Sequence, residues 1–290
     1  MQALVYLGCT VPVRNLNYEV SARKVAAALG VELVDLPGLG CCGYPLKNFD
    51  QEAALVIAAR ALAQAAETGL TVAPLCSACT GTLTEAAHHL DHDAEARARV
   101  QARLKPLGLT YKPGVKVRHL MRFLLEEVGL EAIRAKVTRP LTGFTFAPHY
   151  GCHFLKPSRI MDGFDDPEDP RSLSQLIEAT GAAALDYAAL KDCCGGGVLG
   201  MDEDLAGRMA GGKLGELTAA GVTALTLVCP FCNVMFEGQQ KAIAKRGGLD
   251  IKVPVVYLTQ ILGLAMGFTP DEMGFKLNRA KPKDLLEAFK

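Results

Sequence analysis

The ten cysteines of this chain fall into two groups of five with the same spacing. The first group is Cys9, Cys41, Cys42, Cys76 and Cys79, and the second is Cys152, Cys193, Cys194, Cys229 and Cys232. Each group has the form C…CC…CxxC, and subtracting the numbers of equivalent cysteines gives offsets of 143, 152, 152, 153 and 153. This regularity indicates an internal duplication. About nine residues are inserted after Cys152, and we place the insertion at the acidic stretch 162–170.

Five thiols per group point to metal or redox chemistry. A zinc ion takes four ligands, so it would leave one cysteine over, and an adjacent Cys-Cys pair is awkward for one tetrahedral ion. A polynuclear cluster removes this difficulty because neighbouring sulfurs can bind different irons, although an ordinary four-iron cubane needs only four thiolates. The spacing therefore favours iron–sulfur binding, with zinc binding and dithiol–disulfide exchange as the alternatives.

The bulk composition excludes several classes of protein. Lys+Arg and Asp+Glu number 31 each in 290 residues, so the net charge gives no reason to expect nucleic acid or an anionic membrane as a partner. No stretch approaches the roughly 20 apolar residues that span a bilayer. The N-terminal "MQALVYLGCT" lacks a basic leader and a cleavage site. We expect a cytoplasmic protein without a membrane span, in which disulfides are a poor explanation for ten cysteines.

The elements that must position the cysteines also repeat. Short apolar runs precede the cysteines of each group, at 3–8, 31–36 and 70–76 and again at 144–151, 182–190 and 222–229. Alanine-rich segments of helical length lie between them, at 18–29, 51–67, 172–180 and 202–219. This alternation predicts an α/β protein with two Rossmann-like domains, 1–138 and 139–290, each with a parallel sheet. The cysteines then follow the C-terminal ends of strands, where open α/β sheets bind ligands.

Four further residues are candidates for substrate chemistry. His149 and His153 bracket Cys152, where a proton donor would serve a departing thiolate, so we predict a catalytic role for both, with a structural hydrogen bond as the alternative. Arg14 and Lys47 follow cysteine positions and could meet an anionic substrate, with surface solvation as the default alternative for each. The pair His88/His92 lies on a charged helix and is expected to be solvated.

The two C…CCG…CxxC quintets, together with "YLGCTVPVRNLNYE" near the start and "VCPFCNVMFE" near the end, resemble the B-type subunit of heterodisulfide reductase. The resemblance covers nearly the whole chain. It implies two cysteine-rich (CCG) domains, each holding one noncubane [4Fe-4S] cluster on its five cysteines. It further implies that a disulfide is cleaved between the two clusters, with one electron delivered to each sulfur.

The resemblance also implies partners. The chain has no flavin or nicotinamide motif, so it would receive electrons from an iron–sulfur subunit of the C type, linked to a flavin-containing subunit of the A type. The substrate would be a small or carrier-bound disulfide, or a thiol oxidised in the reverse direction, as in bacterial sulfur oxidation. Two rival functions are an electron-transfer subunit whose clusters never touch substrate and a zinc-stabilised binding module.

Overall fold

Two parallel β-sheets form the frame of the protein. The computed structural model describes residues 1–289. The first sheet has the order β2-β1-β3, with β1 at Gln2–Tyr6, β2 at Glu32–Val34 and β3 at Val72–Pro74. The second has the order β5-β4-β6-β7, with β4 at Thr145–His149, β5 at Ala183–Ala184, β6 at Ala224–Leu227 and β7 at Val255–Tyr257. Every strand pair is parallel, which confirms the predicted α/β class.

Helices surround both sheets, as crossover connections between parallel strands require. In the first half they are α1 (Val11–Arg14), α2 (Leu16–Ala28), α3 (Gln51–Ala66), α4 (Ser77–His92), α5 (Ala94–Leu104), α6 (Leu120–Phe123) and α7 (Leu130–Ala135). In the second they are α8 (Cys152–Leu155), α9 (Ser172–Ala179), α10 (Glu203–Ala220), α11 (Pro230–Asn233), α12 (Gln240–Gly247), α13 (Leu258–Ala265) and α14 (Lys283–Glu287). Among residues 1–289 no helix combines the length and apolar character needed to cross a bilayer.

The repeat extends to the caps of equivalent helices. Helix α3 begins after Asp50, whose side chain accepts a hydrogen bond from the backbone N–H of Ala53. Helix α10 begins after Asp202, whose side chain accepts one from the backbone N–H of Leu205. Such caps satisfy N–H groups that the first helical turn leaves unpaired. The two cysteine pairs are therefore followed by the same capped helix start.

The halves differ at their last strand. Strand β7 pairs with β6 in the second half, whereas the equivalent segment of the first half makes a single bridge between Val72 and Val117. The chain leaves the sheet at once because His119 caps α6, its side chain accepting a hydrogen bond from the N–H of Met121. The position of the predicted boundary between 138 and 139 stays a prediction.

The acidic insertion 162–170 is tied to the fold. Asp165 accepts hydrogen bonds from the backbone N–H groups of Arg171 and Ser172 at the start of α9, at 2.8 to 3.2 Å. Asp162 pairs with the buried guanidinium of Arg122 at 3.0 Å. These contacts give its carboxylates a structural role in closing the loop.

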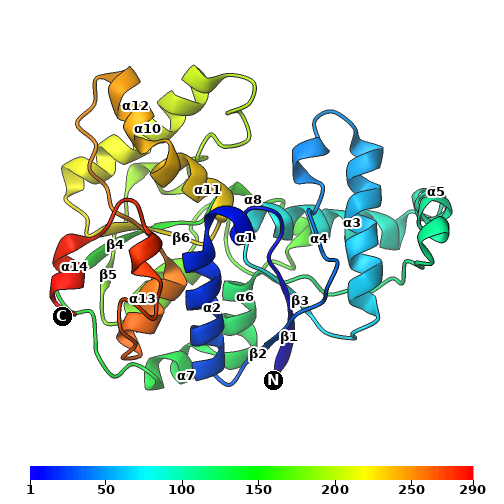
Figure 1. The fold of residues 1–290 in the computed structure, drawn as a ribbon, viewed down its shortest axis with the longest axis horizontal. Coiled ribbons are helices and arrows are strands. Elements are labelled where there is room, and N and C mark those ends of the chain that lie inside the picture. The colour runs from blue at the N-terminus through cyan, green and yellow to red at the C-terminus, as the bar shows by residue number, and fades with distance from the viewer. Residues whose placement is uncertain (290) are drawn as a thin grey trace.

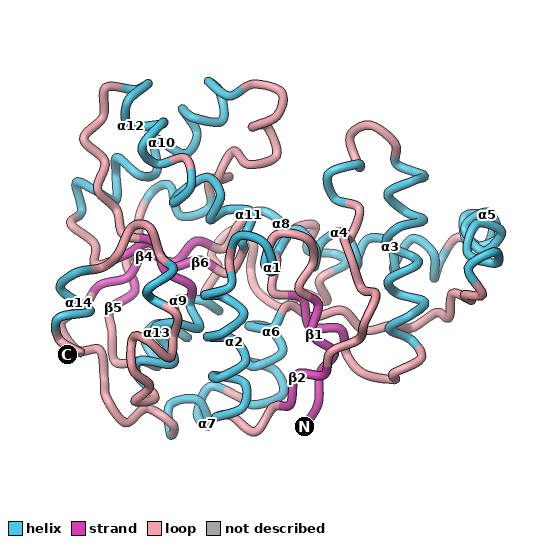
Figure 2. Tube along the Cα trace, in the orientation of Figure 1, coloured by secondary structure: helices cyan, strands magenta, loops and turns pink. Residues whose placement is uncertain are grey.

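The two halves are locked together by buried polar contacts. Helix α2 of the first half packs against α13 of the second, and α4 packs against α8. Figure 1 shows α13, α2 and α6 side by side below the second sheet and toward the first, with α1, α8 and α11 at the centre, and Figure 2 shows the same arrangement. The bonds that cross this seam include Asn15 Nδ2 to Asn233 Oδ1 at 2.8 Å, Tyr18 Oη to the Val228 carbonyl at 3.2 Å, and His119 Nε2 to the same carbonyl at 2.8 Å.

The seam makes stability depend on pH. Burial lowers the pKa of His119 to about 4, because the buried imidazolium is disfavoured. Its pKa is higher in the unfolded chain, so the unfolded state takes up the proton first as the pH falls. The stabilisation is thus present above about pH 6.5 and is lost towards pH 4, amounting to roughly 3 kcal/mol. We expect His119→Gln to flatten this dependence, measured by denaturant unfolding at pH 7 and pH 5. A variant with the unchanged slope would contradict this assignment.

Candidate metal centre

The topology brings the cysteines of each half to the C-terminal edge of its sheet. Cys9 and Cys152 follow β1 and β4. Cys76 and Cys229 are the N-cap residues of α4 and α11, so Cys79 and Cys232 lie in the first turns of these helices. Helix N-termini stabilise negative charge, which favours thiolates at these positions. The predicted placement at strand ends is therefore observed for these six cysteines, whereas Cys41 and Cys193 begin the adjacent pairs 7 and 9 residues after the ends of β2 and β5.

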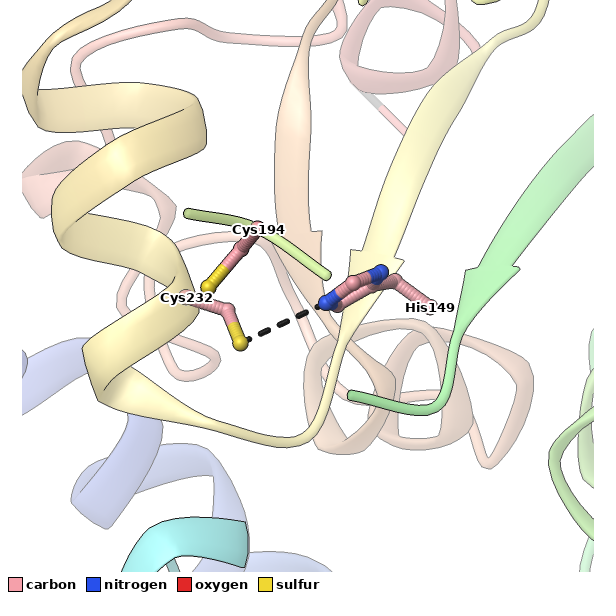
Figure 3. Close-up of side chains that lie close together, drawn as sticks. All are labelled: His149, Cys194 and Cys232. Atoms are coloured by element: carbon pink, nitrogen blue, oxygen red, sulfur yellow. Dashed lines mark hydrogen bonds between the residues drawn. The ribbon is translucent and has the colours of Figure 1, made fainter. Parts of the chain in front are cut away.

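The second quintet lines one cavity. Its volume is about 60 Å³, and all five cysteines of the group contribute to its wall. Tyr44 and Ser77 of the first half also line it, so both halves build this site. Figure 3 shows the sulfurs of Cys194 and Cys232 and the ring of His149 facing a common centre. These three side chains place their donor atoms within 4.8 Å of one another.

In the first quintet the thiols are also in mutual contact. Hydrogen bonds from Cys41 and then Cys79 lower the pKa of Cys42 to about 3. The thiol of Cys79 in turn contacts that of Cys76, and hydrogen bonds with these neighbours together with burial raise the pKa of Cys79. The thiolate of Cys42 is thus stabilised by hydrogen bonds from the protonated thiols of Cys41 and Cys79.

The second quintet also contains thiols of lowered pKa, at other positions of the repeat. Hydrogen bonds from Cys152 and then Cys194 lower the pKa of Cys193 to about 2. Those from Cys232 and Cys76 hold the pKa of Cys229 well below its ordinary value. Each site concentrates soft, partly ionised sulfur donors, and such donors select iron–sulfur clusters, zinc or copper(I) over hard cations.

The two sites touch. The Sγ atoms of the buried Cys76 and Cys229, which are equivalent in the repeat, lie 3.7 Å apart. By contrast, Cys9 and Cys152 are exposed, while Cys41 and Cys193 are half-buried. Each quintet therefore runs from a shared buried end to a member that solvent reaches.

Glycines shape the turns after the cysteine pairs. Gly43 and Gly195 have φ of +90° and +78°, a region that favours glycine. A Cβ would lie 2.7 Å from the carbonyl oxygen of Ala54 at the first position and 2.8 Å from that of Ala206 at the second. The turn can thus press against the following helix only without a side chain, and this sets the direction of the paired thiols.

The residues fit an iron–sulfur group. All ten cysteines are free, so no disulfide competes for the sulfurs. The buried hydroxyl of Ser77, on the wall of the second cavity, has no hydrogen-bond partner among the described residues. A Cβ at Gly8 would lie 2.9 Å from Cys79 Sγ, so backbone approaches the sulfurs closely there. The soft sulfur donors, the unpartnered Ser77 hydroxyl and the close backbone at Gly8 suit iron–sulfur binding.

Of the non-cysteine candidates, the structure brings His153 and Lys47 together. His153 lines the second cavity, and its ring stands edge-on to Tyr44 with centroids 5.1 Å apart. Burial lowers its pKa, and Glu85 and Lys47 act on it from nearby in opposite senses. Lys47 itself forms an ion pair with Glu85. Arg14 is exposed at the end of α1, and its guanidinium pairs with none of the carboxylates within 1–289.

The remaining histidine candidates differ in burial. His149 is buried, with Nε2 3.3 Å from Cys232 Sγ, behind the second quintet. His88 and His92 are exposed, and His92 Nδ1 lies 2.7 Å from the His88 carbonyl oxygen, as a solvated helix face allows.

Sequence reasoning missed two residues of the site. Tyr44 follows the first cysteine pair and reaches the cavity of the second half. Lys213 is 1% exposed, and its Nζ lies 2.9 Å from His149 Nδ1. A signal for Lys213 is present, because it stands on the stripe Ala206–Ala210–Leu214–Leu217 that α10 buries, where a charge is out of place.

Comparison with known proteins agrees with the site. Residues 3–84 and 146–237 match the cysteine-rich domain family, CCG. The B-type subunit of a ferredoxin/F(420)H(2)-dependent CoB-CoM heterodisulfide reductase from Methanosarcina acetivorans is 37% identical over 94% of this chain and 92% of its own. The 8-methylmenaquinol:fumarate reductase membrane anchor subunit of Wolinella succinogenes is 29% identical over 93% of this chain and 94% of its own.

One solved structure shares the fold. A hypothetical protein from Helicobacter pylori superposes with a TM-score of 0.78 at 18% identity, covering 97% of this chain and 52% of that one. The match to the CCG model in both halves and the 37% identity together define the class. The chain belongs to the cysteine-rich domain family, in its branch of heterodisulfide reductase B-type subunits.

Proposed function

We propose that this chain is the iron–sulfur subunit of a heterodisulfide-reductase-like complex and that its two quintets hold two noncubane [4Fe-4S] clusters, between which a disulfide is reduced. The observation that carries this proposal is the meeting of the quintets at Cys76 and Cys229, whose sulfurs are 3.7 Å apart. Two separate zinc modules would have no reason to join their ligands.

The chemistry requires two electrons and two protons for each disulfide, giving two thiols. When bound, the two clusters would supply one electron to each sulfur of the substrate. The electrons would come from an iron–sulfur partner of the C type and a flavin-containing subunit of the A type; the support for partner subunits is that relatives are named as B-type subunits of heterodisulfide reductases. The chain's own residues orient the substrate, hold protons and exclude water.

The exposure of Cys9 and Cys152 supports a catalytic subunit over a pure electron relay. A relay has no need to open its ligands to solvent. Here the exposed member of the second quintet shares a cavity wall with His153, which could donate a proton to a leaving thiolate. Lys47 stands close enough to act electrostatically on His153 and would attract an anionic substrate. Arg14, exposed at the end of α1, would also attract an anionic substrate.

The central test is anaerobic purification followed by iron, acid-labile sulfide and zinc analysis, with EPR before and after adding candidate disulfides. We expect about eight irons per chain, as two four-iron clusters require, and spectra that change when a disulfide binds. A colourless preparation with zinc and no sulfide would reject the proposal. Iron with no response to any disulfide would favour the electron-transfer rival.

His153 provides a second test. His153→Ala should lower the rate of disulfide reduction by about 10²-fold, the lower range for a lost general acid, and leave iron content intact. His89→Ala, an exposed histidine on the neighbouring helix, is the matched control and should leave both unchanged. Wild-type turnover in His153→Ala would remove this histidine from the mechanism.

A further inference from the structure

The repeat is broken at one place next to the sulfurs. His149 ends β4 and stands three residues before Cys152, where the first half has Tyr6 ending β1 three residues before Cys9. On the following long helices, the caps Asp50 and Asp202 fix the register, and Lys213 of α10 then corresponds to Ala61 of α3. One half therefore has Tyr and Ala where the other has His and Lys.

In the first half the tyrosine is occupied by the backbone. Tyr6 Oη donates a hydrogen bond to the carbonyl of Gly40 at 2.7 Å, directly before the Cys41–Cys42 pair. The equivalent carbonyl of the second half belongs to Asp192, directly before Cys193–Cys194, and it accepts a hydrogen bond from Lys213 Nζ at 3.0 Å. The shorter histidine ring thus leaves room that the lysine side chain fills.

The contacts of Lys213 fix the tautomer of His149. Its Nζ has three acceptors within reach, the carbonyls of Leu190 and Asp192 and the Nδ1 of His149, at 3.2, 3.0 and 2.9 Å. An ammonium has three N–H donors, so all three are used. With Nδ1 accepting, the proton of the neutral ring lies on Nε2, which points at Cys232 Sγ from 3.3 Å (Figure 3). His149 is then a donor to a sulfur and not a metal ligand.

Lys213 is a buried cation without an ion pair. It is 1% exposed, and within 1–289 no carboxylate lies within salt-bridge distance of its Nζ. Buried charges are normally paired, because an uncompensated one is strongly disfavoured. The negative groups that act on Lys213 are Cys232 first, then the carboxylate of Asp192, and then Cys194 and Cys193. In the first half, the position of α3 that corresponds to Lys213 is Ala61, which carries no charge.

We infer that Lys213, acting through His149 on Cys232, makes the second cluster site easier to reduce than the first, so that the duplicated sites are an unequal redox pair. This inference rests on the proposed function. A positive charge and an N–H···S hydrogen bond both stabilise the more negative, reduced state of a cluster. Lys213 and His149 are positioning residues in this account and do not touch the substrate.

The test is an EPR-monitored redox titration of each site separately. Cys41→Ala, which leaves only the second site, and Cys193→Ala, which leaves only the first, provide the two backgrounds. We expect the one-electron reduction constant of the second site to exceed that of the first by about tenfold or more, which is about 59 mV. Lys213→Met in the Cys41→Ala background should lower that constant by about tenfold.

Two further variants keep the result interpretable. His149→Gln leaves Lys213 in place, removes the imidazole donor to Cys232 and should lower the same constant. Tyr6→Phe in the Cys193→Ala background is the matched control, and we expect no shift, because its hydroxyl serves the Gly40 carbonyl. Two results, in samples that contain iron and sulfide, would overturn the inference. One is equal reduction potentials at the two sites. The other is a reduction potential of the second site that neither Lys213→Met nor His149→Gln changes. Absence of iron and sulfide from all samples would instead defeat the proposed function.

Discussion

Cys41→Ala and Cys193→Ala should each halve the iron and sulfide per chain, and each should abolish disulfide reduction. The two residues are equivalent members of different quintets, both are half-buried, and neither takes part in the Cys76–Cys229 contact. Loss of either therefore empties one site and leaves the other. A reaction that needs one electron from each site cannot continue, so we expect a rate decrease of at least about a hundredfold, since loss of one transition-state contact already costs that much.

The measurement is metal analysis and viologen-linked disulfide reduction on the same anaerobic samples. Met201→Ala is the control, since Met201 is an exposed side chain on the loop after the second cysteine pair and should affect neither quantity. A single-site variant that keeps wild-type turnover would show that one cluster suffices.

Gly195→Ala should be strongly destabilising. Its φ of +78° disfavours an L side chain, and the added Cβ would meet the Ala206 carbonyl oxygen at 2.8 Å. The left-handed conformation costs about 1–2 kcal/mol and overpacking about 1–3 kcal/mol. We expect the melting temperature to fall by roughly 5–10 °C and the second site to lose iron. Differential scanning calorimetry under nitrogen, with iron analysis, measures both.

Helix α10, which contains Ala206, also provides the control for this substitution. Gly212 lies in α10, and a Cβ there would meet nothing within 4 Å. Gly212→Ala should therefore stabilise the protein by up to about 1 kcal/mol, from helix propensity alone. Equal behaviour of the two alanine variants would refute the role assigned to Gly195.

The local features of the site were predictable from sequence because they are periodic. Ten cysteines at a repeated spacing, each group after apolar runs, predicted the two parallel sheets and the strand-end location. The Asp50 and Asp202 caps, which the sequence analysis did not name, are likewise set by residues within one helical turn. These features depend on neighbours within a few residues, where pattern and propensity are informative.

The contacts between the halves were not predictable. Tyr18 and His119 reach Val228 across more than a hundred residues, and Tyr44 enters the cavity of the other half. Such docking depends on how two finished surfaces fit, which no local pattern encodes. The role of Lys213 was only partly predictable. Its misplaced charge is visible on the buried stripe of α10, but its partner His149 is known only once the helix is packed on β4.

The 3.7 Å contact between Cys76 and Cys229 bears on what limits turnover. On the proposed function, with a cluster on each quintet, electrons would exchange between the two sites over a very short distance, because the two ligand sets are in contact. On that proposal, we expect the slow step in the delivery of protons or in the arrival of electrons from outside. Whichever quintet an electron enters first, its companion is within immediate reach.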